Sequence, residues 1–184
     1  MNAAIIAVNI VCVIGGLVKT KPPSRQFRYF TTLSNLLCAA ASAAVILLWA
    51  IKGALPMWTV VLKYAGTCAV TVTMMTVLLF LGPASHEWKL LLTKEQLFLH
   101  LICPLLAIVS FVFFEKTRMP AAYIAIGALP VVLYGLLYCR KVVFAPEERR
   151  WDDFYGFNKD GKWPLSCGAM AAAGALIALI LWAV

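Results

Sequence analysis

Six long apolar runs dominate this sequence, and they constrain its fold more than any other feature. A bilayer core about 30 Å thick needs about 20 apolar residues in helical form to cross it. Leu, Ala, Val and Ile dominate the runs, and they do not alternate with polar residues as the strands of an outer-membrane barrel do. The sequence therefore predicts an all-α, polytopic membrane bundle of six transmembrane helices. The predicted spans are about 2–18, 29–51, 57–82, 95–114, 120–139 and 165–184.

The composition agrees with a single transmembrane domain over residues 1–184. Hydrophobic residues make up 63% of the chain and charged residues only 13%, and no polar linker divides it. A cleaved signal peptide is the alternative for the first run. Because no basic residue precedes this run and no A-x-A site follows it, we interpret it as a retained span.

Basic residues gather in the connections after the first, third and fifth spans, and this bias predicts the orientation. Cytoplasmic loops carry the excess of Lys and Arg, so both termini are expected outside the plasma membrane. The net charge of +8 then reflects topology and contact with anionic lipids, and no nucleic-acid partner is expected. The basic side holds Lys19, Lys21, Arg25, Arg28, Lys89, Lys94, Arg140, Lys141, Arg149, Arg150, Lys159 and Lys162, against Lys52, Lys116 and Arg118 on the other.

The six cysteines lie within or at the edges of the apolar runs, without a CxxC pair or a cluster. Disulfide frameworks and zinc sites need such clustering, so free buried thiols that fill space are expected. No metal and no organic cofactor is predicted.

Charged groups inside the spans are few. Lys63 lies near the outer end of the third span, where its side chain is expected to reach water. Every acidic residue falls at a span end or in a loop. Proton- or cation-coupled carriers usually keep a carboxylate at membrane depth, so carrier function is the weaker interpretation.

The second and fourth spans bring a hydroxyl and an imidazole to the same depth. Both spans start on the same side of the membrane, so they run parallel. Thr31 lies roughly 4 to 5 Å inside its span and His100 roughly 7 to 8 Å inside its own, at about 1.5 Å per residue. A weak hydroxyl nucleophile needs an adjacent base, and His100 is the histidine available at that depth.

Ser34 and Asn35 share a helical face with Thr31, whereas Thr32 points elsewhere. One interpretation makes Thr31 the nucleophile and Asn35 or Ser34 the support for an oxyanion. The alternative is that the hydroxyls bond their own helix and that Asn35 ties two helices together. Spacing alone favours the alternative.

A family resemblance favours catalysis. The segments FRYFTTLSNLL, LFLHLICPLLAIVSFVFFE, PAAYIAIGALPVVLYGLLY and DDFYGFN occur in this order over about residues 26–180. Together they resemble small six-helix bacterial relatives of the androgen-induced and androgen-regulated membrane hydrolases. The resemblance implies a threonine hydrolase that splits fatty acid esters of hydroxy fatty acids, with Thr31 and His100 as its reactive pair.

Other residues enter as expectations around that pair. Cys103, three residues after His100, keeps open a variant in which a cysteine transfers the acyl group, although a buried filler is favoured. Pro104 and Pro130 remove helical hydrogen bonds, and kinks there would widen a cavity for an acyl chain. Residues 140–164 form a candidate lid, from which Tyr155 or Asn158 would orient His100.

The expected partner is a membrane lipid or fatty acyl ester, and the oligomeric state stays open. A non-catalytic membrane protein that binds or transports a lipid or small apolar solute is the rival interpretation.

Overall fold

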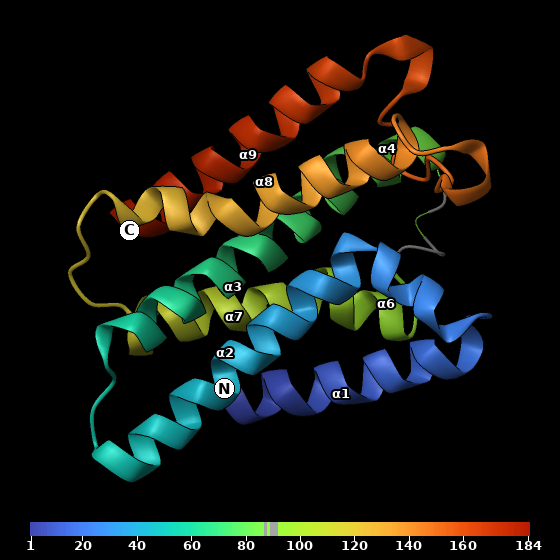
Figure 1. The fold of residues 1–184 in the computed structure, drawn as a ribbon. Coiled ribbons are helices and arrows are strands. Elements are labelled where there is room, and N and C mark those ends of the chain that lie inside the picture. Colours follow the sequence, from blue (N-terminus) through green and yellow to red (C-terminus); the bar gives the residue numbers. More distant parts are fainter. Residues whose placement is uncertain (87, 89–91) are drawn as a thin grey trace.

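The computed structural model describes residues 1–86, 88 and 92–184, and their regular elements are helices (Figure 1). The all-α prediction is thus confirmed for this part of the chain. Six of its helices are long and apolar enough to cross a membrane, as expected. These spans are α1 (Asn2–Lys19), α2 (Phe30–Lys52), α3 with η2 (Met57–Leu81), α6 to η4 (Glu95–Glu115), α8 (Tyr123–Val142) and α9 (Trp163–Ala183).

Helix α3 (Met57–Thr76) occupies the centre of the bundle. It packs against α2, α8, α9 and α7 (Cys103–Ser110). In the span that it forms with η2, 67% of the most apolar 18 residues are buried, against 17% in α9. A helix that is surrounded by other helices loses contact with lipid. Polar side chains can therefore be carried on α3 because neighbouring helices, rather than lipid, surround them.

The connections alternate between the two ends of the bundle. Residues 20–29, the short helices α4 (Gly82–Ser85) and α6 (Glu95–Leu97) and the loop 143–162 lie at one end, on the right in Figure 1. Residues 53–56 and 116–122 lie at the other end with the termini. This is the alternation that the sequence predicted, while the side of the membrane that each end faces stays a prediction.

The fourth span changes its helical winding around Pro104. It begins as α6 (Glu95–Leu97), passes through the π-helical η3 (Phe98–Ile102) and α7, and ends in the π-helical η4 (Phe111–Glu115). In η3 the Cys103 N–H bonds to the carbonyl of Phe98, five residues back. Pro104 has no N–H, so it cannot continue this pattern to the carbonyl of Leu99.

Lys63 does not reach water, and the prediction that it would is wrong. Its side chain is 0% exposed, and its ammonium donates to Asn2 Oδ1 (2.6 Å) and Ser42 Oγ (2.7 Å). Glu115 Oε2 lies 3.9 Å from Lys63 Nζ, and Glu115 Oε1 accepts from Ser110 Oγ at 2.7 Å. The carboxylate ends its span as predicted, but it turns inward. A buried charge without partners would be strongly destabilising. The contacts of Lys63 and Glu115 supply these partners and connect the first four spans.

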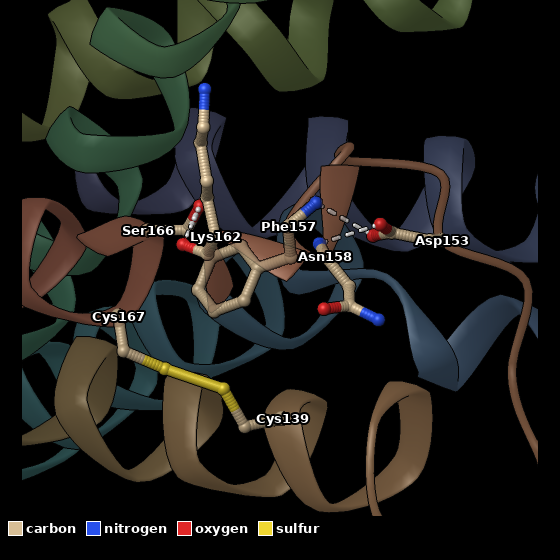
Figure 2. The surroundings of a disulfide bond; sticks show 7 residues. All are labelled: Cys139, Asp153, Phe157, Asn158, Lys162, Ser166 and Cys167. Carbon is tan, nitrogen blue, oxygen red and sulfur yellow. Dashed lines mark hydrogen bonds between the residues drawn. A yellow bond between two sulfur atoms is a disulfide. The ribbon is translucent and has the colours of Figure 1, made fainter. Parts of the chain in front are cut away.

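Two cysteines form a disulfide, contrary to the expectation of free thiols. Cys139, near the end of α8, is bonded to Cys167, in the second turn of α9 (Figure 2). The two residues are far apart in sequence but adjacent in the fold because α8 and α9 pack side by side. The remaining four cysteines are free and buried, as predicted, namely Cys12, Cys38, Cys68 and Cys103.

The disulfide can be tested by counting thiols. Alkylation of the denatured protein should modify four cysteines before reduction and six after it, read as the mass of the intact chain. In Cys139→Ser the count should be five in both conditions. Six modified cysteines without reduction would contradict the bond.

Candidate active site

Thr31 and His100 meet at the end of the bundle that carries the loop 143–162. Thr31 lies in the first turn of α2, and its Oγ1 is 3.4 Å from His100 Nε2 in η3. His100 is only 6% exposed. In the tautomer with its proton on Nδ1, the imidazole presents Nε2 as an acceptor to the Thr31 hydroxyl. The contact is long for a hydrogen bond.

Asn35 holds the two helices together at this point. Its side-chain nitrogen donates to the Thr31 carbonyl at 2.8 Å and to the Leu99 carbonyl at 3.1 Å. Pro104 has no N–H to donate to the Leu99 carbonyl, so the Asn35 side chain replaces the missing helical donor. Both amide hydrogens are thus engaged. Asn35 therefore ties α2 to the fourth span, which fits the second of the two roles considered from the sequence and leaves no free N–H for an oxyanion.

Ser34 also has a structural role. It is 1% exposed, and its hydroxyl contacts the Thr31 carbonyl at 3.2 Å and Thr73 Oγ1 at 2.9 Å. Thr73 belongs to α3, so Ser34 ties α2 to the central helix. Ser34 is not among the residues that line the neighbouring cavity. The oxyanion role expected for it does not fit this position.

A cavity of about 260 Å³ opens beside Thr31. Its polar side chains include Thr31, Thr73 and Tyr155, and most of the remaining wall is apolar. The wall continues along η2 (Val77–Leu81) and the first half of α9. Phe80 and Ala169 line the cavity and are also exposed on the bundle surface, so the cavity opens sideways between these two elements.

The proline kinks do not form this cavity. Neither Pro104 nor Pro130 is among its lining residues, contrary to the expectation. The cavity lies between η2 and the start of α9, whereas Tyr64 near the other end of α3 bonds directly to the Ala178 carbonyl of α9 at 2.5 Å. His100 is not among the lining residues, so Thr31 is the member of the pair that borders the cavity.

Tyr155 reaches the site from the loop, but at Thr31. Its hydroxyl oxygen accepts from the Phe30 N–H at 3.1 Å, and the hydroxyls of Tyr134 and Thr31 interact with it. Tyr134 itself donates to the Arg28 carbonyl at 2.7 Å. Burial raises the pKa of Tyr155 to about 12, so the phenol keeps its proton at neutral pH. The residue expected to orient His100 therefore places its O–H next to Thr31.

Asp153 fixes the turn that presents Tyr155. Its carboxylate accepts from the backbone N–H groups of Phe157 and Asn158, both at 2.7 Å (Figure 2). It also accepts from Tyr138 Oη at 3.1 Å. Asn158 thus takes part through its backbone in shaping the turn, which is a different role from the orienter that the sequence suggested.

The loop is also attached to the segment before α2. Arg25 pairs with Asp152 at 2.6 Å, and the Arg28 guanidinium lies 5.6 Å from the Trp151 ring centre. These contacts attach the loop to the segment that precedes α2, while the lid role of residues 140–164 stays a prediction.

Cys103 is not placed for acyl transfer. Its side chain is 0% exposed and contacts Asn9 Nδ2 at 3.5 Å, and it does not line the cavity. This favours the buried filler that the sequence also suggested.

Sequence reasoning missed Thr73, Thr76 and Tyr134 as parts of the site. The sequence signal that could have identified the two threonines was the group of threonines in the third span, since buried hydroxyls need hydrogen-bond partners.

The fold and the site together define a six-helix protein of the integral membrane type, with a hydroxyl–imidazole pair beside a lateral apolar cavity. Comparisons with protein-family models, with curated proteins and with solved structures gave no match.

Proposed function

We propose that this protein is an intramembrane ester hydrolase with Thr31 as nucleophile and His100 as general base. The observation that carries the proposal is the 3.4 Å approach of Thr31 Oγ1 to His100 Nε2 beside an apolar cavity that opens sideways. The substrate class is a membrane lipid or fatty acyl ester, and the resemblance points to fatty acid esters of hydroxy fatty acids. Such a protein would lie in the bacterial plasma membrane with its termini outside.

In the first half-reaction Thr31 Oγ1 attacks the ester carbonyl carbon while His100 Nε2 takes its proton. The carbonyl oxygen becomes an oxyanion, and the Tyr155 O–H donates to it. When the tetrahedral intermediate collapses, the ester C–O bond breaks and the imidazolium gives its proton to the leaving alcohol. The product is an acyl ester on Thr31.

In the second half-reaction a water molecule attacks the acyl carbon and His100 takes the proton of the water. The bond to Thr31 then breaks, the proton returns to Thr31 Oγ1, and the fatty acid leaves. Asn35 contributes by holding the Thr31 and Leu99 carbonyls, which fixes the two reacting side chains relative to each other.

A fluorophosphonate probe tests the proposal, because it reacts with an activated hydroxyl and stays attached. The detergent-solubilised wild-type protein should gain one adduct, and peptide mapping should locate it on Thr31. Prior incubation with a fatty acyl ester should slow the labelling. A folded protein that gains no adduct, or gains it at another residue, contradicts the proposal and favours non-catalytic lipid binding.

A further inference from the structure

The cavity beside Thr31 also limits which acyl group it can accept. The described residues that line it carry no charged side chain, and apolar surface makes up most of its wall. Moving an ionised group into such surroundings is strongly unfavourable unless a partner charge is present. The part of a ligand that enters the cavity must therefore be uncharged.

The size of the cavity sets a length. A protein cavity of about 150 Å³ holds benzene, with its six carbons, so about 260 Å³ corresponds by proportion to about ten carbons. The dimensions agree, because the lining residues extend from Val72 to Leu81 along α3 and η2, which is roughly 13 Å at helical rise.

Helix α9 contributes Ser166, Ala169, Met170 and Ala173 to the cavity wall, and two of these carry the argument on length. Met170 lines the cavity, and its methyl group packs over Gly135 of α8, where an added Cβ would come within 2.3 Å of it. Ala173 lies three residues further along the same helix and also lines the cavity. Met170 is a large side chain and Ala173 a small one, so substitutions at these two positions change the space that the cavity leaves for a ligand.

We infer that this cavity selects an uncharged acyl chain of about ten carbons, with Met170 and Ala173 as the residues that set the length. The inference rests on the proposed function for the position of the ester, which would lie between Thr31 and Tyr155. The chain would enter from the lipid between η2 and α9. Because lipid is as apolar as the cavity, preference comes from filling the space and not from leaving water.

Native mass spectrometry tests the inference on Thr31→Ala, which cannot turn over its ligand. The full-length protein is equilibrated in micelles with an equimolar mixture of methyl esters from six to sixteen carbons and with decanoate. The ester of about ten carbons should dominate the bound population, with about a fivefold loss for each carbon removed. Decanoate should be excluded.

Two further variants should move the preferred length in opposite directions. Met170→Ala removes three heavy atoms from the wall and should lengthen the preferred chain by about three carbons, whereas Ala173→Leu adds three and should shorten it by about three. Misfolding cannot produce shifts of opposite sign. A flat distribution that neither variant changes, or equal binding of decanoate, overturns the inference.

The outcomes also separate this inference from the proposed function. Selective binding that shifts with both variants, together with a wild type that hydrolyses none of the esters, would leave the binding inference standing and remove the hydrolase. Hydrolysis of all esters at equal rates would support the hydrolase and contradict the selection of chain length.

Discussion

Thr31→Ala is expected to lower the turnover of a fatty acyl ester by at least about 10³-fold, because it removes the only proposed nucleophile. His100→Ala should lower it by about 10²- to 10⁴-fold, which is the usual contribution of a general base. Since the two residues act as one unit, the turnover of the double variant should be no lower than that of the less active single variant. Initial rates of fatty acid release in lipid nanodiscs measure all three.

Thr32→Ala is the matched control, because Thr32 is the neighbouring threonine in the first turn of α2, is buried and does not line the cavity. Its turnover should stay close to that of the wild type. Thr31→Ser keeps a hydroxyl at the same place and should retain activity. Wild-type rates in Thr31→Ala would exclude this residue as the nucleophile.

Lys63→Met is expected to lower the free energy of unfolding by about 3 to 5 kcal/mol, because it leaves the Glu115 carboxylate buried without its cation. The paired variant Lys63→Met, Glu115→Leu replaces both charges by apolar groups. It should recover most of that loss, since no unpaired charge then remains in the core. Unfolding of the purified protein by a denaturing detergent, followed by circular dichroism, gives the comparison.

Lys52→Met controls for the loss of a positive charge, because Lys52 is exposed at the end of α2. Its effect should stay within about 0.5 kcal/mol. If Lys63→Met is as stable as Lys52→Met, the Lys63 side chain reaches water and the buried pair does not form.

The spans and the shared depth of Thr31 and His100 could be predicted because both follow from counting along a helix, whereas the pairing of the two side chains was implied by the family resemblance. A fixed rise per residue converts a position in a span into a depth, and parallel spans share the same starting side. The six predicted ranges match the helices within a few residues. The same counting placed the two side chains in one layer.

The partners of individual side chains could not be predicted in this way. Lys63 was expected in water because its partner, Glu115, lies in a different span, and only the packing of α3 against that span brings them together. For Asn35 the sequence left two roles open, because the backbone carbonyl that accepts from its amide becomes available only through the π-helical turn and Pro104 of another span. Cys139 and Cys167 showed no pattern in sequence, because their proximity arises from two neighbouring helices.

The buried lysine also bears on how the chain enters the membrane during synthesis. The third span leaves the ribosome with a cation in its first half, while the carboxylate that pairs with it belongs to the following span. Until that span arrives, the third helix carries an unmatched charge and is poorly suited to surrounding lipid. The two spans are therefore best released from the translocon together, which makes assembly of this core a cooperative step of biogenesis.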